Sequence, residues 1–308
     1  MFRRGPPTSY EACFRLATSK SSAILPDCGM YAEHLRIPIG VGALHVERVG
    51  RGGPPVVLLH GLGTCTFLWR RLSPALAAAG YTALAIDLLG HGESEHPFDA
   101  NYSLPAQADY LARALDALRL PSAAVIGQDI GGLTALLLAA NPRARVNALM
   151  LLSPPDPDDL PGPEVRSLQR ASARLALNAN SLFGARPALA GLLRAGVTKA
   201  EHMSDLLVAR YVAPFVGRDG LNRLLQRSAA VELTEEARAT LERVSVPTLI
   251  IEGTDDGDTR PLISWSALLP RATVSIEQLE GVGRLIPEDA PDRFVGLALG
   301  WLNDQRMR

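Results

Sequence analysis

One acidic side chain lies in a sequence pattern that presents nucleophiles. Residues 127–132 read GQDIGG, so Asp129 takes the central position of the pattern G-x-Nu-x-G between a strand-like and a helix-like apolar run. The glycines permit a strained turn from strand to helix that exposes residue 129, and the start of the helix stabilises negative charge there. A carboxylate is one of the side chains that can act as a nucleophile in enzymes. The alternative interpretation is a tight turn in which Asp129 caps the helix.

Two other polar turns follow apolar runs. The segment HGLG (60–63) comes after the run PVVLL, and the segment DLLGHGES (87–94) comes after the run TALAI. Glycines in such segments let the backbone turn tightly and present N–H groups. Because ligand sites in parallel sheets lie at the carboxyl ends of strands, we expect the site to be built from these turns and from residues 127–132.

The order of the apolar runs predicts the elements that position these turns. Eight runs are typical of strands: 35–39, 43–49, 55–59, 82–86, 123–126, 147–152, 246–251 and 273–278. Five segments have helical spacing: 67–79, 104–118, 133–140, 262–269 and 290–303. Buried strands that alternate with helices indicate a parallel sheet covered by helices.

The alternation stops between residues 156 and 244, where Ala, Leu and Arg dominate with helical periods. We therefore predict an α/β fold with a mostly parallel eight-stranded sheet, a core of residues 35–155 and 245–308, and an inserted helical cap at 156–244. Residues 1–34 are polar and irregular. Their role stays open between a tail, a segment that packs over the cap, and a contact with a second subunit in a homodimer.

Composition argues against several classes of protein. The 308 residues include 31 basic and 32 acidic side chains, a balance that disfavours nucleic-acid binding. We find no apolar run of about 18 residues and expect no membrane span. The three cysteines, Cys13, Cys28 and Cys65, lack C-x-x-C spacing, which disfavours a disulfide scaffold or a zinc ribbon. Free thiols and the absence of a signal-peptide pattern favour a cytoplasmic location.

Cofactor motifs are missing as well. The segment GQDIGG is not a dinucleotide fingerprint, the chain has no P-loop lysine, and its His and acidic residues lack zinc spacing. We therefore expect neither a cofactor nor a metal, and we expect the partner to be a small-molecule substrate.

Taken together, the three turns resemble those of the α/β-hydrolase superfamily, and the resemblance covers about residues 36–308. An Asp at the nucleophile position is similar to the epoxide hydrolase and haloalkane dehalogenase branch. The resemblance implies that Asp129 attacks the substrate and forms an ester, which a His then hydrolyses with the help of a second acid. It also implies an oxyanion hole made by the backbone N–H groups of Leu62 and Ile130.

The second acid is expected after the run at 246–251, in a G-x-x-D pattern. Asp256 matches this position best, with Asp255 as its neighbour, and Asp156 lies near a second position that some dehalogenases use. The alternative interpretation of Asp255 and Asp256 is a solvated acidic turn.

The family histidine is replaced. Residues 281–291 (GVGRLIPEDAP) resemble the G-x-G-H segment of the family, but Arg284 occupies the His position. Arginine stays protonated and cannot act as a general base. Either Arg284 holds Asp129 as an anion or binds an anionic substrate, or it points to solvent in a decayed site. A relocated base is a further alternative, with His91 and His202 as candidates.

Four residues are candidates for substrate contact: His60, Trp69, Tyr211 and Phe215. Tyr211 is the one tyrosine of the predicted cap, and the resemblance implies that a cap tyrosine protonates an epoxide oxygen. The alternatives are a structural hydrogen-bonding role for His60 and burial of Tyr211. The resemblance also implies that dehalogenases commonly hold the halide with a Trp directly after the nucleophile. This chain has Ile130 there, which disfavours dehalogenation.

Because the base is missing, we predict an enzyme that performs non-hydrolytic acid–base chemistry through Asp129. An isomerase, cyclase or lyase reaction of a mostly apolar small molecule fits this prediction. Two alternatives stay open. One is an epoxide hydrolase-like enzyme with a relocated base, and the other is a ligand-binding pseudoenzyme that uses the cap cavity.

Overall fold

The structure is a computed structural model that describes residues 32–161, 165–166, 186–255 and 265–307. Most of the predicted N-terminal segment, part of the predicted cap and Asp256 lie outside the described residues.

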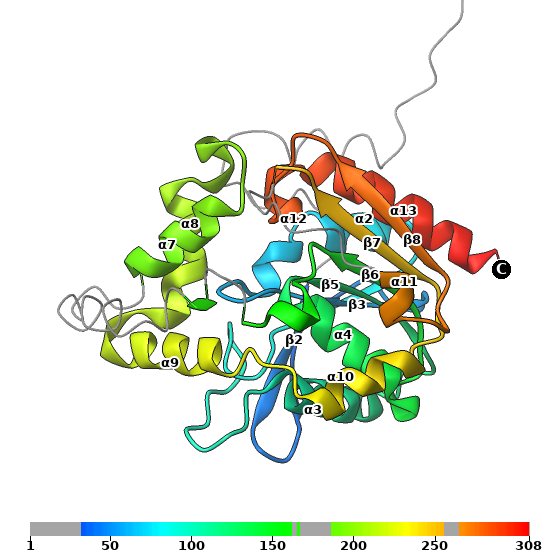
Figure 1. The fold of residues 1–308 in the computed structure, drawn as a ribbon, viewed down its shortest axis with the longest axis horizontal. Helices are drawn as coiled ribbons and strands as arrows, with labels where there is room; N and C mark the ends of the chain where they lie inside the picture. Colours follow the sequence, from blue (N-terminus) through cyan, green and yellow to red (C-terminus); the bar gives the residue numbers. More distant parts are fainter. Residues whose placement is uncertain (1–31, 162–164, 167–185, 256–264, 308) are drawn as a thin grey trace, which may run out of the picture.

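A central sheet of eight strands organises the described chain (Figure 1). Its strands are β1 (Glu33–Pro38), β2 (Ala43–Val49), β3 (Pro55–Leu59), β4 (Thr82–Ile86), β5 (Ala123–Gln128), β6 (Val146–Leu152), β7 (Thr248–Gly253) and β8 (Val274–Leu279). They lie in the order β1-β2-β4-β3-β5-β6-β7-β8. The pairs β1/β2 and β2/β4 are antiparallel, and the other pairs are parallel. The predicted eight-stranded, mostly parallel sheet is therefore confirmed.

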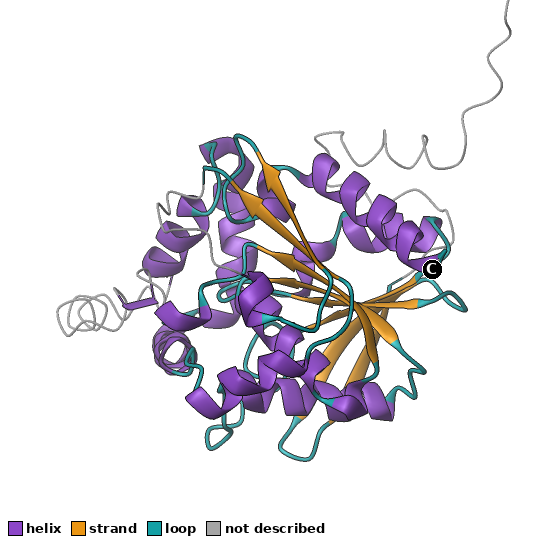
Figure 2. Ribbon diagram, turned by 45° about the vertical axis from the view of Figure 1, so that its right-hand side comes forward, coloured by secondary structure: helices purple, strands orange, loops and turns teal. Residues whose placement is uncertain are grey.

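The central strands are buried on both faces, as their unbroken apolar runs predict. Leu58 of β3 pairs with Ile126 of β5, and both side chains are fully buried. Alternate residues of β3 enter two separate hydrophobic clusters, one on each side of the sheet. Figure 2 shows helices on both sides of the strands.

The core helices are α2 (Leu72–Ala78), α3 (Leu104–Ala117), α4 (Ile130–Ala140), α11 (Trp265–Leu268), α12 (Ile286–Asp289) and α13 (Pro291–Arg306). Side chains of α2 and α13 join one hydrophobic cluster, and those of α3 and α4 join the other. The helix predicted at 67–79 is split into a 3-10 turn, η1 (Thr66–Trp69), and α2. Pro74 explains the break, because it has no N–H to donate to the carbonyl of residue 70.

A second helical layer lies at one end of the core and contains α7 (Arg186–Ala195), α8 (Asp205–Val212) and α9 (Gly217–Ala229) (Figure 1). Ser204 caps α8 by accepting a hydrogen bond from the Leu207 N–H. The helix α10 (Glu235–Thr240) and the 3-10 turn after it, η7 (Leu241–Arg243), instead pack back onto α4, with Ala237 and Leu241 buried. The domain limits at 156 and 244 stay a prediction.

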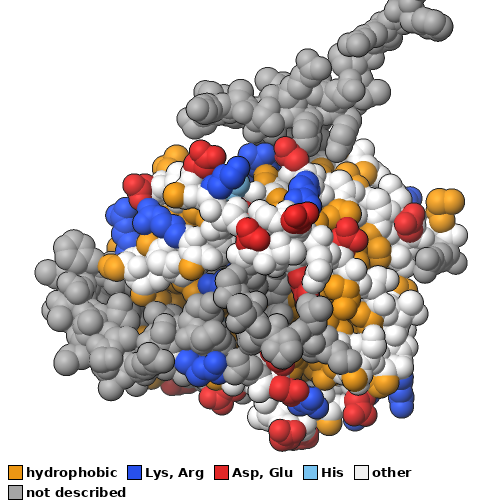
Figure 3. All heavy atoms as spheres, turned by 45° about the horizontal axis from the view of Figure 1, so that its top comes forward, with side chains coloured by type: hydrophobic (Ala, Val, Ile, Leu, Met, Phe, Trp, Pro, Cys, Tyr) orange, Lys and Arg blue, Asp and Glu red, His pale blue; other side chains and the backbone are white. Residues whose placement is uncertain are grey.

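The lengths of the helices and the distribution of surface charge can be compared with the membrane and nucleic-acid predictions. Of the helices that the structure describes, none has both the length and the apolar character that a bilayer crossing requires. On the face drawn in Figure 3, acidic and basic side chains of the described residues are interspersed and do not gather by sign.

Candidate active site

The turn at Asp129 has the strained geometry that its glycines predict. Asp129 links β5 directly to α4 with φ 53° and ψ −126°, a region that L-residues rarely adopt. A Cβ atom on Gly127 would lie 2.4 Å from the Gly131 carbonyl oxygen, and one on Gly131 would lie 2.4 Å from the His60 carbonyl oxygen. Side chains at these two positions would therefore prevent the turn from closing.

The carboxylate of Asp129 faces the HGLG turn that follows β3. The Leu62 N–H donates to Asp129 Oδ2 at 2.9 Å. A Cβ atom on Gly61 would lie 2.9 Å from the same oxygen, so glycine is needed for this approach. Ile130 begins α4, where the first backbone N–H groups have no acceptor within the helix. The Leu62 N–H thus contacts the half-buried carboxylate, and the part of Ile130 in an oxyanion hole stays a prediction.

His60 connects the turn after β3 with the turn after β4. Its ring is fully buried, with Nδ1 2.8 Å from the Gly61 carbonyl oxygen and Nε2 accepting from the Leu88 N–H at 3.0 Å. Burial lowers the pKa of His60. The geometry agrees with the structural alternative for His60 and leaves its expected substrate contact without support.

A cavity lies between the ends of β3, β5 and β6 and the helical layer, and the turn at 87–94, which was expected to help build the site, contributes no residue to its described lining. Asp129 and Arg284 both line it. The other lining residues are mostly apolar and come from the strand ends and from the helical layer: Gly61, Leu62, Thr64, Gln128, Ile130, Ser153, Pro154, Pro155, Leu160, Val165, Leu192, Leu193, Gly196, Val231 and Leu285. A mostly apolar wall with a few convergent polar groups is typical of a small-molecule site.

Arg284 reaches this cavity because its backbone is tied to the turn at Asp129. The Gln128 side-chain amide donates to the Arg284 carbonyl oxygen at 2.9 Å. The Leu285 N–H donates to the Gly196 carbonyl oxygen of the cap at 2.7 Å. The half-buried Arg284 side chain therefore lies between core and cap, and the alternative that it simply points to solvent is not what the structure describes.

The structure describes two of the three candidates for the second acid, Asp255 and Asp156. Asp256 lies outside the described residues. Asp255 is exposed, and its N–H donates to the Val282 carbonyl oxygen at 3.0 Å, which places the end of β7 beside the segment that carries Arg284. Asp156 caps a short turn by accepting from the Asp158 N–H at 2.8 Å. Neither Asp255 nor Asp156 is among the residues that line the cavity.

The two candidates for a relocated base have other partners. The buried ring of His91 packs against His60 and Phe215, and burial holds the pKa of His91 well below its ordinary value. His202 Nδ1 lies 2.6 Å from Asp289 Oδ1. No histidine is found among the described residues that line the cavity with Asp129.

The aromatic candidates are packed away from the cavity. Tyr211 is buried, and its hydroxyl donates a hydrogen bond to the Glu288 carboxylate. The same carboxylate accepts from Arg70, with Nη1 at 2.5 Å from Oε1 and Nη2 at 2.7 Å from Oε2. Burial, followed by the charge of Glu288, raises the pKa of Tyr211 well above its ordinary value. Trp69 packs against Phe294. The described lining includes none of the four residues expected to contact substrate, which are His60, Trp69, Tyr211 and Phe215.

Sequence reasoning missed other residues of the site. Gln128 and Ser153 line the cavity and were not among the expected site residues. Ser153 directly follows β6 and has φ 39°, so its place at a strand end was a usable signal. Leu192 and Leu193 lie on α7, where a helical period alone does not tell which side faces the core.

A family model described as alpha/beta hydrolase fold matches residues 54–277. The chain belongs to the α/β-hydrolase family. The prediction of a hydrolase-family protein is thereby confirmed.

Relatives of this α/β-hydrolase family member include proteins of the expected branch. Bifunctional epoxide hydrolase 2 of Mus musculus is 37% identical over 130 residues, which are 41% of this chain and 23% of the mouse protein. A haloalkane dehalogenase of Mycobacterium marinum is 43% identical over 97 residues, which are 31% of this chain and 33% of that enzyme. The matches thus span 23% and 33% of the length of these relatives. The expected likeness to the epoxide hydrolase and haloalkane dehalogenase branch is confirmed.

A solved structure gives the same fold over nearly the whole chain. The epoxide hydrolase CorEH superposes with a TM-score of 0.74 at 24% identity, covering 89% of this chain and 99% of that one. This likeness concerns the fold. The roles of Asp129, Asp256 and Arg284 stay predictions.

Proposed function

We propose that this chain is an enzyme that opens a small apolar epoxide by attack of Asp129 on carbon. The observation that carries the proposal is the Leu62 N–H bonded to Asp129 Oδ2 at 2.9 Å, beside a mostly apolar cavity. One carboxylate oxygen is then oriented by the backbone, and the other forms the new C–O bond. As that bond forms, the epoxide C–O bond breaks and leaves negative charge on the departing oxygen.

Arg284 fits the role of a cationic stabiliser for that oxygen. Its side chain lines the same cavity, and a guanidinium donates several hydrogen bonds but accepts none. The alkoxide takes its proton from water, and the product of this half-reaction is a hydroxyalkyl ester on Asp129. Because Arg284 cannot remove a proton from water, we expect hydrolysis of this ester to be slow.

The likeness to known proteins favours this proposal over non-hydrolytic chemistry as the main reaction. The named relatives are an epoxide hydrolase and a haloalkane dehalogenase. An epoxide is favoured over an alkyl halide because Ile130, which cannot donate a side-chain hydrogen bond to a halide, follows the nucleophile.

A second candidate is acid–base catalysis by Asp129 without a covalent intermediate, as in an isomerase, cyclase or lyase. The specific observation that favours it is Arg284 at the position where the family has its base. In this alternative, Asp129 removes a proton from the substrate, and Arg284 and the Leu62 N–H stabilise the resulting anion.

Intact-mass measurement separates the two candidates. The pure protein is incubated with small apolar epoxides, activated esters and alkyl halides, with Asp129→Asn as the matched control. We expect wild-type protein to gain the mass of the epoxide, peptide mapping to place the adduct on Asp129, and Asp129→Asn to gain nothing. Diol release without an adduct would show that a base outside the described lining hydrolyses the ester quickly. Neither adduct nor diol would reject epoxide opening and favour the second candidate.

A further inference from the structure

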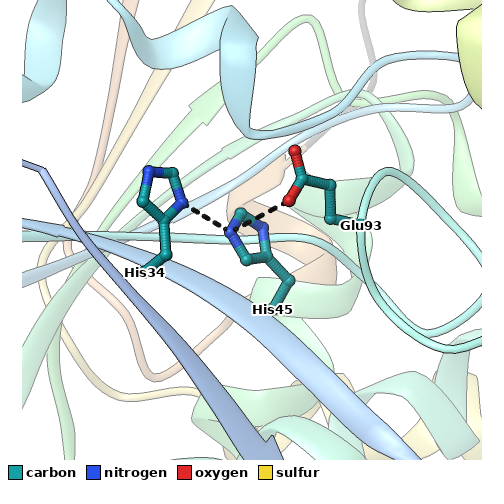
Figure 4. Close-up of side chains that lie close together, drawn as sticks. All are labelled: His34, His45 and Glu93. Carbon is teal, nitrogen blue, oxygen red and sulfur yellow. Dashed lines mark hydrogen bonds and ion pairs between the residues drawn. The ribbon is translucent and has the colours of Figure 1, made fainter.

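A second group of potential ligands lies at the edge of the sheet and belongs to three separate segments. His34 is on β1, His45 is on β2, and Glu93 is in the loop after β4 (Figure 4). One ligand atom from each of the three lies within 4.8 Å of the others. His34 Nδ1 is 3.0 Å from His45 Nε2, and Glu93 Oε2 is 3.8 Å from the same nitrogen. None of these residues lines the cavity of Asp129.

A buried carboxylate orients the central ligand. His45 Nδ1 lies 2.8 Å from Asp87 Oδ2, and both side chains are almost fully buried. Asp87 is held in turn by the Thr66 N–H at 2.7 Å and the Glu93 N–H at 2.9 Å. When His45 Nδ1 donates its proton to Asp87, the lone pair of Nε2 points toward His34 and Glu93. A carboxylate that orients a ligating histidine in this way is a regular feature of protein metal sites.

The spacing of the two imidazoles is close to what a metal requires. Two nitrogens that each lie 2.0–2.1 Å from a tetrahedral zinc ion are about 3.3 Å apart. The observed 3.0 Å needs only a small rotation of His34, whose side chain is exposed. Glu93 is exposed as well, so its carboxylate can swing toward the ion and water can take a fourth position.

The charge around the two imidazoles favours a cation. Glu47 is the cross-strand partner of His34, and Asp87 and Glu93 flank His45. Arg36, the cross-strand partner of His45, is paired with Glu95 at 3.1 Å. Three carboxylates therefore lie around the two histidines.

We propose that His34, His45 and Glu93 bind one divalent transition-metal ion, with Zn²⁺ as the best match to two imidazoles and a carboxylate. The bound ion would cross-link the β1–β2 hairpin to the loop after β4. It would act on the stability of this edge of the sheet rather than on chemistry at Asp129.

The test uses the untagged 308-residue chain after removal of metal by a chelator. Zn²⁺ is titrated calorimetrically, and Co²⁺ is used as a coloured probe of tetrahedral coordination. We expect one saturable equivalent in the wild type and a visible Co²⁺ band. His34→Ala and Glu93→Gln should each weaken Zn²⁺ binding at least tenfold, and Glu93→Asp should weaken it less than Glu93→Gln.

Matched controls isolate the three ligands. His96→Gln changes another histidine of the same loop, and Cys13→Ser with Cys28→Ser removes two thiols outside the described residues, so each should bind Zn²⁺ as the wild type does. A thermal scan provides a second measurement. Zn²⁺ should raise the Tm of the wild type but not of His34→Ala, while the metal-free Tm values stay similar because His34 is exposed.

Three outcomes would overturn the proposal. They are absence of saturable binding in the wild type, unchanged affinity in His34→Ala, or equal loss of affinity in His96→Gln. In each case the 3.0 Å contact between His34 and His45 would be only a hydrogen bond between two imidazoles.

Discussion

The side-chain amide of Gln128 donates a hydrogen bond to the backbone carbonyl of Arg284 at 2.9 Å. Gln128 is the last residue of β5 and directly precedes Asp129, so one buried side chain connects the nucleophile turn to the segment that carries the arginine. The relative position of Asp129 and Arg284 therefore depends on a residue that sequence reasoning did not assign to the site.

We expect Gln128→Met to lower both stability and adduct formation. Loss of the hydrogen bond leaves the Arg284 carbonyl unsatisfied, which costs about 1–3 kcal/mol in the free energy of unfolding. The rate of adduct formation with epoxide should fall because Arg284 is less well positioned. Gln107→Met is the matched control, since Gln107 makes two hydrogen bonds to the backbone of Leu89 and is not among the residues that line the cavity. If both variants lose stability and adduct rate equally, Gln128 has no positioning role.

Arg284→His restores the residue type that the family resemblance implies. A histidine here can remove a proton from water, and general-base catalysis contributes roughly 10²–10⁴-fold. We expect the ester on Asp129 to decay at least about a hundredfold faster, with release of diol, as followed by intact mass over time. Arg284→Gln, which also removes the charge but supplies no base, should show no such acceleration. Equal decay in both variants would contradict the proposed role of position 284.

The strain at Asp129 predicts an unusual order of stability among variants. In most positions of regular structure glycine is less stable than alanine by up to about 1 kcal/mol. At φ 53° and ψ −126° the order should reverse, with Asp129→Gly more stable than Asp129→Ala by about 1–3 kcal/mol. Urea unfolding of the two variants measures this difference, and both lack the carboxylate, so its hydrogen bond does not enter the comparison. A more stable alanine variant would show that the turn relaxes.

The buried Glu288 should be critical for the packing between core and cap. Its carboxylate accepts from Arg70 and Tyr211, and its side chain is 3% exposed. Glu288→Gln leaves the Arg70 charge without its counter-ion, which we expect to cost about 3 kcal/mol, at the low end for buried pairs because 27% of the Arg70 side chain is exposed.

A nearby exposed pair gives the control for Glu288. Asp292 lies 3.7 Å from Arg71, and both side chains are well exposed. Asp292→Asn should therefore change the free energy of unfolding by less than about 1 kcal/mol. Similar losses in the two variants, measured by urea unfolding, would mean that the Arg70–Glu288 pair adds no more than a surface pair.

Asp289 should contribute to the acid sensitivity of folding. Burial raises the pKa of Asp289, but hydrogen bonds from the Gly283 N–H, His202 and Thr198 outweigh it and hold the pKa below its ordinary value. A carboxyl group whose pKa is lowered on folding stabilises the protein fully above the unfolded pKa, which is about 3.9 for Asp. This contribution is lost as the pH falls through the lowered folded pKa.

The Tm of Asp289→Asn as a function of pH tests this expectation. The Tm difference from the wild type should be largest near neutral pH and should shrink from about pH 4 downward. Asp292→Asn, which changes an exposed carboxylate, should show little difference from the wild type over the same range. A Tm difference for Asp289→Asn that is constant with pH would rule out a proton-linked role for this carboxyl group.

The parts of the fold that could be predicted are those marked by a local sequence pattern, such as an apolar run or a turn motif. The run at 55–59 and the pattern around Asp129 indicate a buried strand and a strand-to-helix turn without knowledge of their neighbours. The orientation of Tyr211 could not be predicted in this way, because burial against Glu288 depends on a contact between residues 77 positions apart. Cap residues such as Leu192 pose the same difficulty.

The group of His34, His45 and Glu93 could not be predicted from the sequence either, because its members are distant in sequence. Spacing rules for zinc consider ligands that are close in sequence, and by those rules the sequence predicts no metal site. Here the antiparallel pairing of β1 and β2, and the loop after β4, bring together three residues that no short motif contains. Only the register of the sheet makes this group visible.

The contacts around Asp289 have a consequence for protein engineering. Asp289 contacts Thr198, His202 and the Gly283 N–H. The Leu285 N–H donates to the Gly196 carbonyl oxygen, so cap residues 196–202 and core residues 283–289 share one set of hydrogen bonds. A chimera that imports a foreign cap at residues 156–244 alone would separate these partners. Cap exchange with a relative should therefore transfer residues 281–291 together with the cap, although the two pieces lie far apart in the sequence.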